Sequence, residues 1–105
     1  MKKSFFILVL GSLLISAPAW AEDPKIEIKE YEFVPKSLTV AVGTKVTWVN
    51  RDEIPHTIDD GNKGFHSAAL DTDDTYSYIF TQPGTYQYFC RLHPHMTGTI
   101  AVTAK

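Results

Sequence analysis

Short alternations of apolar and polar residues run through residues 25–104 and predict an all-β protein. Side chains on a strand point alternately to the two faces of a sheet, so a half-buried strand shows a period of two residues. The segments with this period are 25–31, 37–42, 45–50, 75–80, 86–90 and 97–104. Phe33 and Pro35 form a break after the first segment, and residues 65–74 show no clear period. About seven short strands at regular spacing favour a β-sandwich or a barrel.

The first 21 residues have a different pattern. Lys2 and Lys3 precede an apolar run from Phe5 to Ile15, and the small-residue pattern Ala19-Trp20-Ala21 follows. This arrangement predicts a secretory signal peptide at residues 1–21, because a transmembrane helix needs roughly 20 apolar residues. We therefore expect residues 22–105 to form a single monomeric domain in the periplasm, outside the membrane.

Removing the signal peptide changes the charge of the chain. Eight basic and twelve acidic side chains remain, a net charge of −4 with neutral histidines. This balance excludes a general nucleic-acid binder, which needs a basic face. Small exported domains often gain stability from disulfides, but Cys90 is the only cysteine. A lone thiol in an oxidising compartment suggests a metal site.

Four residues predict the type of metal site. Cys90, His93 and Met96 follow one another as Cys-x-x-His-x-x-Met between two expected strands, and His56 comes 34 residues before Cys90. Two imidazoles and a thiolate, with a weak thioether, are the ligands of an electron-transfer copper site. A loop bounded by two antiparallel strands can turn three ligands towards one point, and His56 would arrive from the other sheet. Zinc also binds Cys/His₂ sites, but structural zinc normally takes a stronger fourth ligand than methionine.

The other candidate residues have simpler interpretations. We expect His66 to lie in a surface loop and Trp48 to be a core residue, not an electron relay. His95 should point outward, towards a partner, since Pro94 prevents both neighbouring histidines from turning inward. A set of acidic residues could be a solvated rim or, alternatively, a docking patch for a basic partner. These residues are Asp52, Glu53, Asp59, Asp60, Asp71, Asp73 and Asp74.

The chain resembles the cupredoxins, the small blue copper proteins. The matching stretches are Phe33-Val34-Pro35, Leu38-Thr39-Val40, residues 43–50, Pro55-His56, and residues 84–90 through Ile100-Ala101-Val102. The short spacing from His93 to Met96 is similar to that of the amicyanins. The resemblance implies a Greek-key β-sandwich with copper near one end. It also implies that His93 is the ligand nearest solvent, inside an apolar partner surface formed by Pro55, Leu92 and Pro94.

Three positions next to the ligands depart from the amicyanin pattern. Thr57 replaces the usual Asn, Arg91 the usual Ser or Thr, and Leu92 the usual Pro. Groups that surround a metal's ligands tune the metal. We hypothesise that the Leu92 N–H, which proline lacks, donates a second hydrogen bond to the Cys90 sulfur and raises the reduction potential.

The resemblance implies a periplasmic one-electron carrier whose copper cycles between Cu(II) and Cu(I). Its partners would be transient redox proteins, such as a c-type cytochrome, a dehydrogenase or a reductase. The alternative is a copper-binding or copper-delivery protein that uses the same residues without carrying electrons. We do not expect an enzyme, because a copper nitrite reductase needs a second domain and a Cys-His hydrolase needs an orienting third group.

Overall fold

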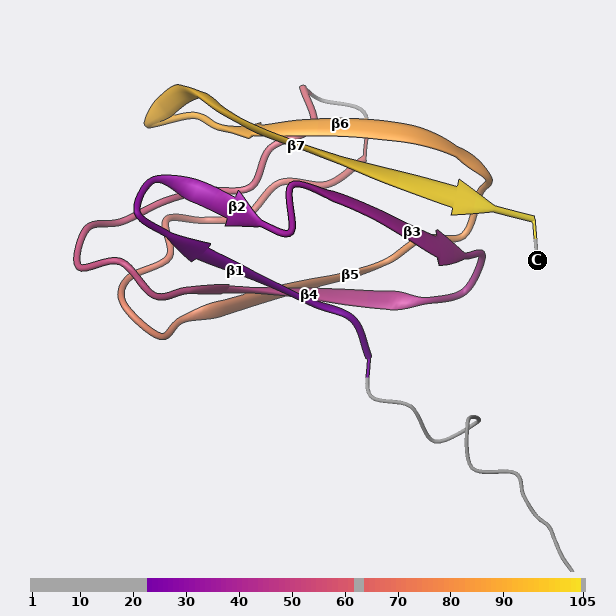
Figure 1. Ribbon diagram of the computed structural model, residues 1–105, viewed down its shortest axis with the longest axis horizontal. Coiled ribbons are helices and arrows are strands. Elements are labelled where there is room, and N and C mark those ends of the chain that lie inside the picture. Colours follow the sequence, from indigo (N-terminus) through magenta and orange to yellow (C-terminus); the bar gives the residue numbers. More distant parts are fainter. Residues whose placement is uncertain (1–22, 62–63, 105) are drawn as a thin grey trace, which may run out of the picture.

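A computed structural model describes residues 23–61 and 64–104 and contains seven strands in this part of the chain (Figure 1). The strands are β1 Lys25–Lys29, β2 Glu32–Val34, β3 Ser37–Ala41, β4 Lys45–Asn50, β5 Thr75–Ile79, β6 Gly84–Cys90 and β7 His93–Thr103. Across these described residues, no helix has the length and apolar character needed to cross a membrane. The expected signal peptide, residues 1–21, lies outside the described residues.

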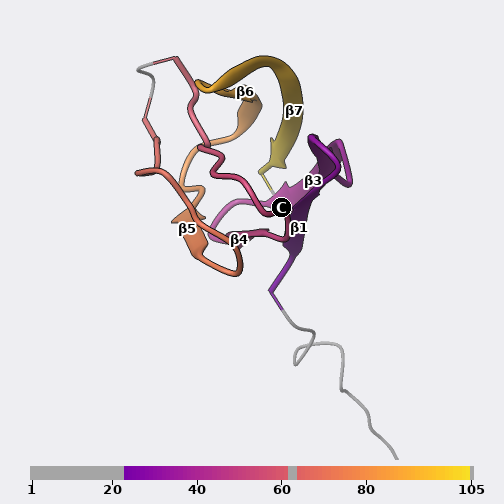
Figure 2. The same ribbon diagram turned by 90° about the vertical axis from the view of Figure 1, so that its left-hand side faces the viewer.

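The strands form two sheets that pack face to face. One sheet has the order β2-β1-β4-β5 and the other the order β3-β7-β6. The pairs β1–β4 and β3–β7 are parallel, and the remaining pairs are antiparallel. The chain changes sheet between β2 and β3, between β3 and β4, and between β5 and β6. In Figure 2 the strands β6 and β7 lie above β4 and β5. The prediction of an all-β Greek-key sandwich is confirmed.

The strand boundaries differ from the predicted ones near one end of the sandwich. Strand β1 ends at Lys29 instead of residue 31, and the stretch predicted as a break contains the short strand β2. Strand β7 begins at His93 rather than at Thr97, although its regular pairing with β6 starts at Thr97, opposite Phe89. The bulge between Phe89 and Cys90 accounts for this difference, because a bulge adds residues to one strand of a pair.

The space between the sheets is filled largely by aromatic rings. Trp48 is fully buried, which confirms its prediction as a core residue, and its ring packs edge-on against Tyr88 at 5.4 Å. Phe33 also packs edge-on against the Tyr88 ring, at 4.7 Å. Phe65, from a segment without a period, stacks on Trp48 at 5.9 Å. Rings at such separations add about 0.5–1.5 kcal/mol per pair beyond the burial of their surface.

The Tyr88 hydroxyl should make the protein sensitive to alkali. Burial raises the pKa of Tyr88 to about 12, and the nearby Trp48 indole N–H only partly opposes this rise. An unfolded tyrosine loses its proton near pH 10. The folded state is therefore fully favoured below pH 10 and loses about 3 kcal/mol of stability as the pH rises to 12. Urea unfolding of the copper-free protein at pH 9 and 12 measures this loss.

The matched variant for this prediction is Tyr88→Phe. In the described part of the chain the hydroxyl has no hydrogen bond of ordinary geometry, so the ring can be kept while the ionisable group is removed. We expect the variant to lose clearly less stability than the wild type between pH 9 and pH 12. An equal loss in the two proteins would contradict the assignment to Tyr88.

Candidate metal centre

The turn from β6 to β7, which joins Cys90 to His93, lies at one end of the sandwich, at the left in Figure 1. The long connection between β4 and β5 carries His56, whose backbone exchanges two hydrogen bonds with Leu70, at 3.2 and 2.8 Å. The fully buried Asn50 side chain donates to the carbonyls of Ile54 and Leu70, at 2.9 and 2.8 Å. A buried amide with satisfied donors fixes a loop in one conformation, so His56 has a defined position.

A second set of hydrogen bonds joins this connection to the other sheet. Asp59 and Phe89 exchange backbone hydrogen bonds of 2.9 Å in both directions. This pairing places Thr57, two residues before Asp59, close to Cys90 at the end of β6. His56 was expected to arrive from a strand end of the other sheet, but it lies within the connection that follows β4.

His56, Cys90 and His93 come together as predicted. Each offers one donor atom, and the three atoms lie within 4.8 Å of one another. The Cys90 sulfur is 3.7 Å from Nδ1 of His56 and 3.7 Å from Nδ1 of His93. His56 and Cys90 are buried, while His93 is half-buried. A thiolate and two imidazole nitrogens at this separation fit a trigonal copper(I/II) site. Met96 lies on β7, buried in the same apolar cluster as Cys90.

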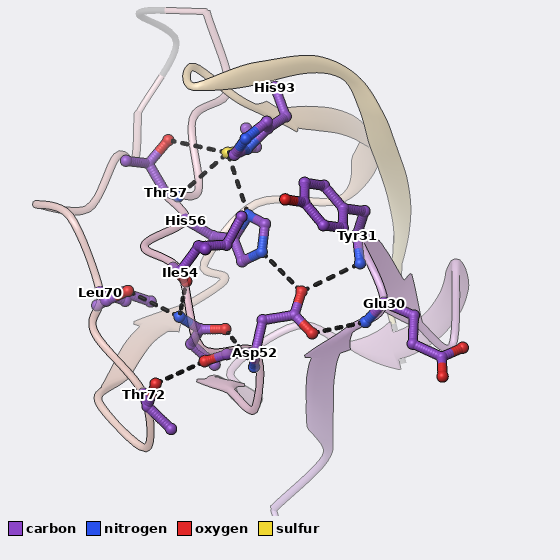
Figure 3. A network of polar contacts seen from close by, with 11 residues as sticks. Glu30, Tyr31, Asp52, Ile54, His56, Thr57, Leu70, Thr72 and His93 are labelled. Carbon is purple, nitrogen blue, oxygen red and sulfur yellow. Dashed lines mark hydrogen bonds and ion pairs between the residues drawn. The ribbon is translucent and has the colours of Figure 1, made fainter.

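Asp52 orients the first histidine, although it was predicted only as part of an acidic rim or docking patch. Its Oδ2 lies 2.8 Å from Nε2 of His56 (Figure 3). An ionised carboxylate only accepts hydrogen bonds, so Nε2 carries the proton and Nδ1 keeps its lone pair for a metal. The same carboxylate accepts the backbone N–H groups of Glu30 at 2.6 Å and Tyr31 at 3.0 Å.

The charge of Asp52 is maintained by these contacts. Partial burial would raise the pKa of the Asp52 carboxyl, but the hydrogen bonds from Tyr31, Glu30 and His56 outweigh it and lower the pKa below its usual range. Asp52 thus stays ionised where it faces the site. The sequence gives little indication of this role. Asp52 precedes His56 by four residues, but in a loop that spacing does not predict that the two side chains are in contact.

Thr57 connects the two ligand segments. Its N–H donates to the Cys90 sulfur at 3.4 Å, and its buried hydroxyl lies 3.9 Å from the same sulfur. The hydroxyl oxygen accepts the N–H of Arg91 at 2.8 Å. In residues 23–61 and 64–104, no hydrogen bond joins the Leu92 N–H to the sulfur, so the hypothesis that Leu92 provides a second donor is wrong. The hydroxyl of Thr57 takes that place.

Removing the Thr57 hydroxyl should lower the reduction potential. A donor to the sulfur withdraws charge from the thiolate, which favours Cu(I). A hydrogen bond worth about 0.5–1.5 kcal/mol corresponds to about 20–60 mV for one electron. We expect Thr57→Val to lower the potential by this amount in voltammetry and Thr57→Ser, which keeps the hydroxyl, to stay near the wild type. Equal potentials for Val and Ser variants would show that the hydroxyl does not act on the sulfur.

The acidic residues do not all form a solvated rim. Asp59 and Asp60 are only 7% and 5% exposed, and Asp52 is half-buried, so the prediction is wrong for these three. The Arg91 guanidinium donates to Asp59 at 2.7 Å and holds the pKa of that carboxyl below its usual range. Asp60 accepts the Phe65 N–H at 3.1 Å. The other members of the set, Glu53, Asp71, Asp73 and Asp74, are exposed as predicted.

The surroundings of His93 are exposed. Leu92 is 50% exposed, and Pro55, Pro94 and His95 are also exposed, which confirms the outward position of His95. His66 is exposed as predicted.

Tyr31 also contacts the site, although sequence reasoning missed it. Its ring packs edge-on against His93 at 4.9 Å and against His56 at 5.5 Å.

Comparison with known proteins agrees with this site. Residues 22–103 match the copper binding proteins of the plastocyanin/azurin family. The chain belongs to this family of cupredoxins. With the donor cluster described above, the match shows that this cupredoxin has a single type 1 copper site, made by His56, Cys90, His93 and Met96.

Individual relatives cover most of the cupredoxin. It is 31% identical over 100 residues to amicyanin-alpha of Methylorubrum extorquens, covering 90% of this chain and 84% of the relative. It is 40% identical over 83 residues to plastocyanin of Scenedesmus fuscus, covering 67% of this chain and 85% of that protein. The solved structure of a purple cupredoxin from Nitrosopumilus maritimus has 35% identity and a TM-score of 0.72 over 77% of this chain and 100% of its own.

Proposed function

We propose that this cupredoxin is a periplasmic one-electron carrier that docks to redox partners through the surface around His93. The observation that carries the proposal is the position of two imidazole Nδ1 atoms, each 3.7 Å from the Cys90 sulfur. Bound copper would supply a centre that accepts and gives up a single electron. The kinship with amicyanin and plastocyanin supports a carrier role for a chain of this size.

Some residues of the chain would hold the copper, and the burial of the site would shield it from water. His56, Cys90 and His93 would provide the three strong ligands, and Met96 a weak axial one. The bonds of Asp52 and Thr57 to His56 and Cys90 keep these ligands in place. Ligands fixed by the protein move little when the charge of the site changes, and this favours fast electron transfer. The burial of His56, Cys90 and Met96 excludes water from all but the His93 side.

Docking would use the exposed residues on that side. Pro55, Leu92, Pro94 and His95 surround the half-buried His93 and make its imidazole the shortest route from the site to a partner. The patch is small, and small interfaces are typical of weak and brief redox encounters. A c-type cytochrome, a dehydrogenase or a reductase is the class of partner that such a patch would meet.

The visible absorption spectrum tests the proposal. One equivalent of Cu(II) should give the purified protein an intense thiolate-to-copper band, which ascorbate bleaches and an oxidant restores. The Cys90→Ser variant should stay nearly colourless with the same amount of copper. Weak bands in the wild type would contradict the site. An intense band without reversible bleaching, together with fast transfer of copper to an acceptor protein, would instead favour copper delivery.

The proposed location has its own test. We expect the full chain, expressed in a bacterium, to accumulate in the periplasmic fraction with a mass that starts at Glu22. Protein that stays in the cytoplasm at its full mass would contradict both the export and the cleavage site.

A further inference from the structure

The turn between β1 and β2 is strained and lies beside the metal centre. Lys29 pairs with Glu32, so Glu30 and Tyr31 form a two-residue hairpin turn. Their φ angles are 54° and 62°, in the left-handed region. Two-residue hairpin turns with positive φ at both positions favour Asn-Gly, because most side chains are disfavoured at positive φ. Strained residues persist where their surroundings fix them, often at functional sites.

One carboxylate holds this turn to a metal ligand. Asp52 accepts the N–H groups of both strained residues, and its Oδ2 also accepts His56 Nε2 (Figure 3). Any relaxation of the turn would therefore break bonds to the group that orients His56. The strain is offset by charge-assisted hydrogen bonds, which are about twice as strong as neutral ones.

The strained turn places the Tyr31 ring against both ligand imidazoles. The ring lies 4.9 Å from His93, at an interplanar angle of 82°, and 5.5 Å from His56, at 86°. The imidazoles themselves lie 5.1 Å apart, so one ring contacts the pair (Figure 3). Tyr31 is 45% exposed, so it is not a core residue. An apolar function in the core does not explain this position.

We propose that Tyr31 is a positioning residue whose ring clamps His93 and His56 in their ligating orientations. The proposal rests on the proposed function, because it concerns the same copper site. His93 is the ligand on the exposed side and has the most freedom to rotate. With Tyr31 packed against it, the imidazole is confined, so copper should leave slowly. The strain at Glu30 and Tyr31 is the consequence of placing a large ring there.

Three variants separate the ring from the strain. Tyr31→Asn removes the ring and substitutes a residue that tolerates positive φ. Tyr31→Phe keeps the ring, and Glu30→Asn relieves strain while Tyr31 stays in place. Two quantities are measured for each protein: the rate at which excess bicinchoninate extracts Cu(I), and the urea midpoint of the copper-free form.

We expect Tyr31→Asn to speed extraction by about 3- to 10-fold, the factor that corresponds to an aromatic edge contact. Its copper-free urea midpoint should be unchanged or higher, because the strain is relieved. Tyr31→Phe should stay within about twofold of the wild type in extraction rate. Glu30→Asn should raise the urea midpoint and leave extraction unchanged. A merely structural role of Tyr31 predicts instead that the faster extraction in Tyr31→Asn is accompanied by a lower urea midpoint.

Two results would overturn the clamp. One is an unchanged extraction rate in Tyr31→Asn, and the other is an equal acceleration in Tyr31→Phe and Tyr31→Asn. The absorption spectrum of the wild type is recorded before any extraction. If the intense band is absent there, the proposed function fails and the clamp with it, whereas a normal band with insensitive extraction overturns the clamp alone.

Discussion

Replacing Gly98 by alanine should remove much of the stability of the fold. Gly98 lies on β7 directly opposite Tyr88 of β6. A Cβ at this position would lie 2.3 Å from Cζ and 2.4 Å from Oη of Tyr88. The ring cannot move away, because Trp48 and Phe33 pack on it and it is 1% exposed. The aromatic ring thus occupies the space that glycine leaves free in the sheet.

The expected loss is about 3 kcal/mol, at the upper end for an overpacked core. Native domains have roughly 5–15 kcal/mol in total. In a domain of this size the melting temperature should fall by about 15 °C, measured by circular dichroism on the copper-free protein. Gly64→Ala is the matched control, since its Cβ meets only the end of the Tyr78 side chain at 3.3 Å and the Asp60 carboxylate at 3.5 Å. In a Tyr88→Leu background, Gly98→Ala should cost much less. A Gly98→Ala cost that does not depend on residue 88 would contradict the steric explanation.

The contrast between β4 and the β1–β2 turn shows what the periodicity of the sequence reveals about the fold. Strand β4, Lys45–Asn50, has the predicted bounds, because Val46 and Trp48 alternate with Lys45 and Thr47 before the buried end of the strand. Strand β2 has only three residues, too few to establish a period. Its hairpin turn is formed by Glu30 and Tyr31, which lack the Asn or Gly signal of such turns. The energy that holds this turn comes from Asp52, more than 20 residues away.

The metal centre likewise has a part that the sequence predicts and a part that it does not. The ligand types and the spacing of Cys90, His93 and Met96 were sufficient to predict copper, because the coordination chemistry is local to the sequence. The residues that position the ligands come from other segments. Asp59 has the charge of a surface residue, yet it is buried because Arg91 from the ligand turn pairs with it. Hydrogen bonds between a backbone N–H and a side chain 21–34 residues away, such as Tyr31 N–H to Asp52 and Arg91 N–H to Thr57, depend on the finished fold.

Asp52→Ala should weaken copper binding by about 10- to 100-fold, the effect expected when the partner of a ligating histidine is lost. Three donors lose their acceptor at once: His56 Nε2 and the N–H groups of Glu30 and Tyr31. His56 could then adopt the tautomer with the proton on Nδ1, which leaves the nitrogen that faces Cys90 without a lone pair for a metal. The strained turn would also lose its support, at a cost of about 2–3 kcal/mol in stability. Competition with a chelator of known affinity measures the first effect, and urea unfolding of the copper-free protein measures the second.

Glu53→Ala is the matched control, because it removes the same charge from the neighbouring residue, which is exposed. If Asp52 acted only through its charge near the site, the two variants would weaken copper binding to a similar extent, and raised salt would reduce the difference between each and the wild type. Direct hydrogen bonding predicts a large effect for Asp52→Ala alone, insensitive to salt. Asp52→Asn should lie between them, since its amide oxygen can accept one or two of the three donors but carries no charge. An Asp52→Ala affinity equal to that of Glu53→Ala would show that His56 keeps its orientation without the carboxylate.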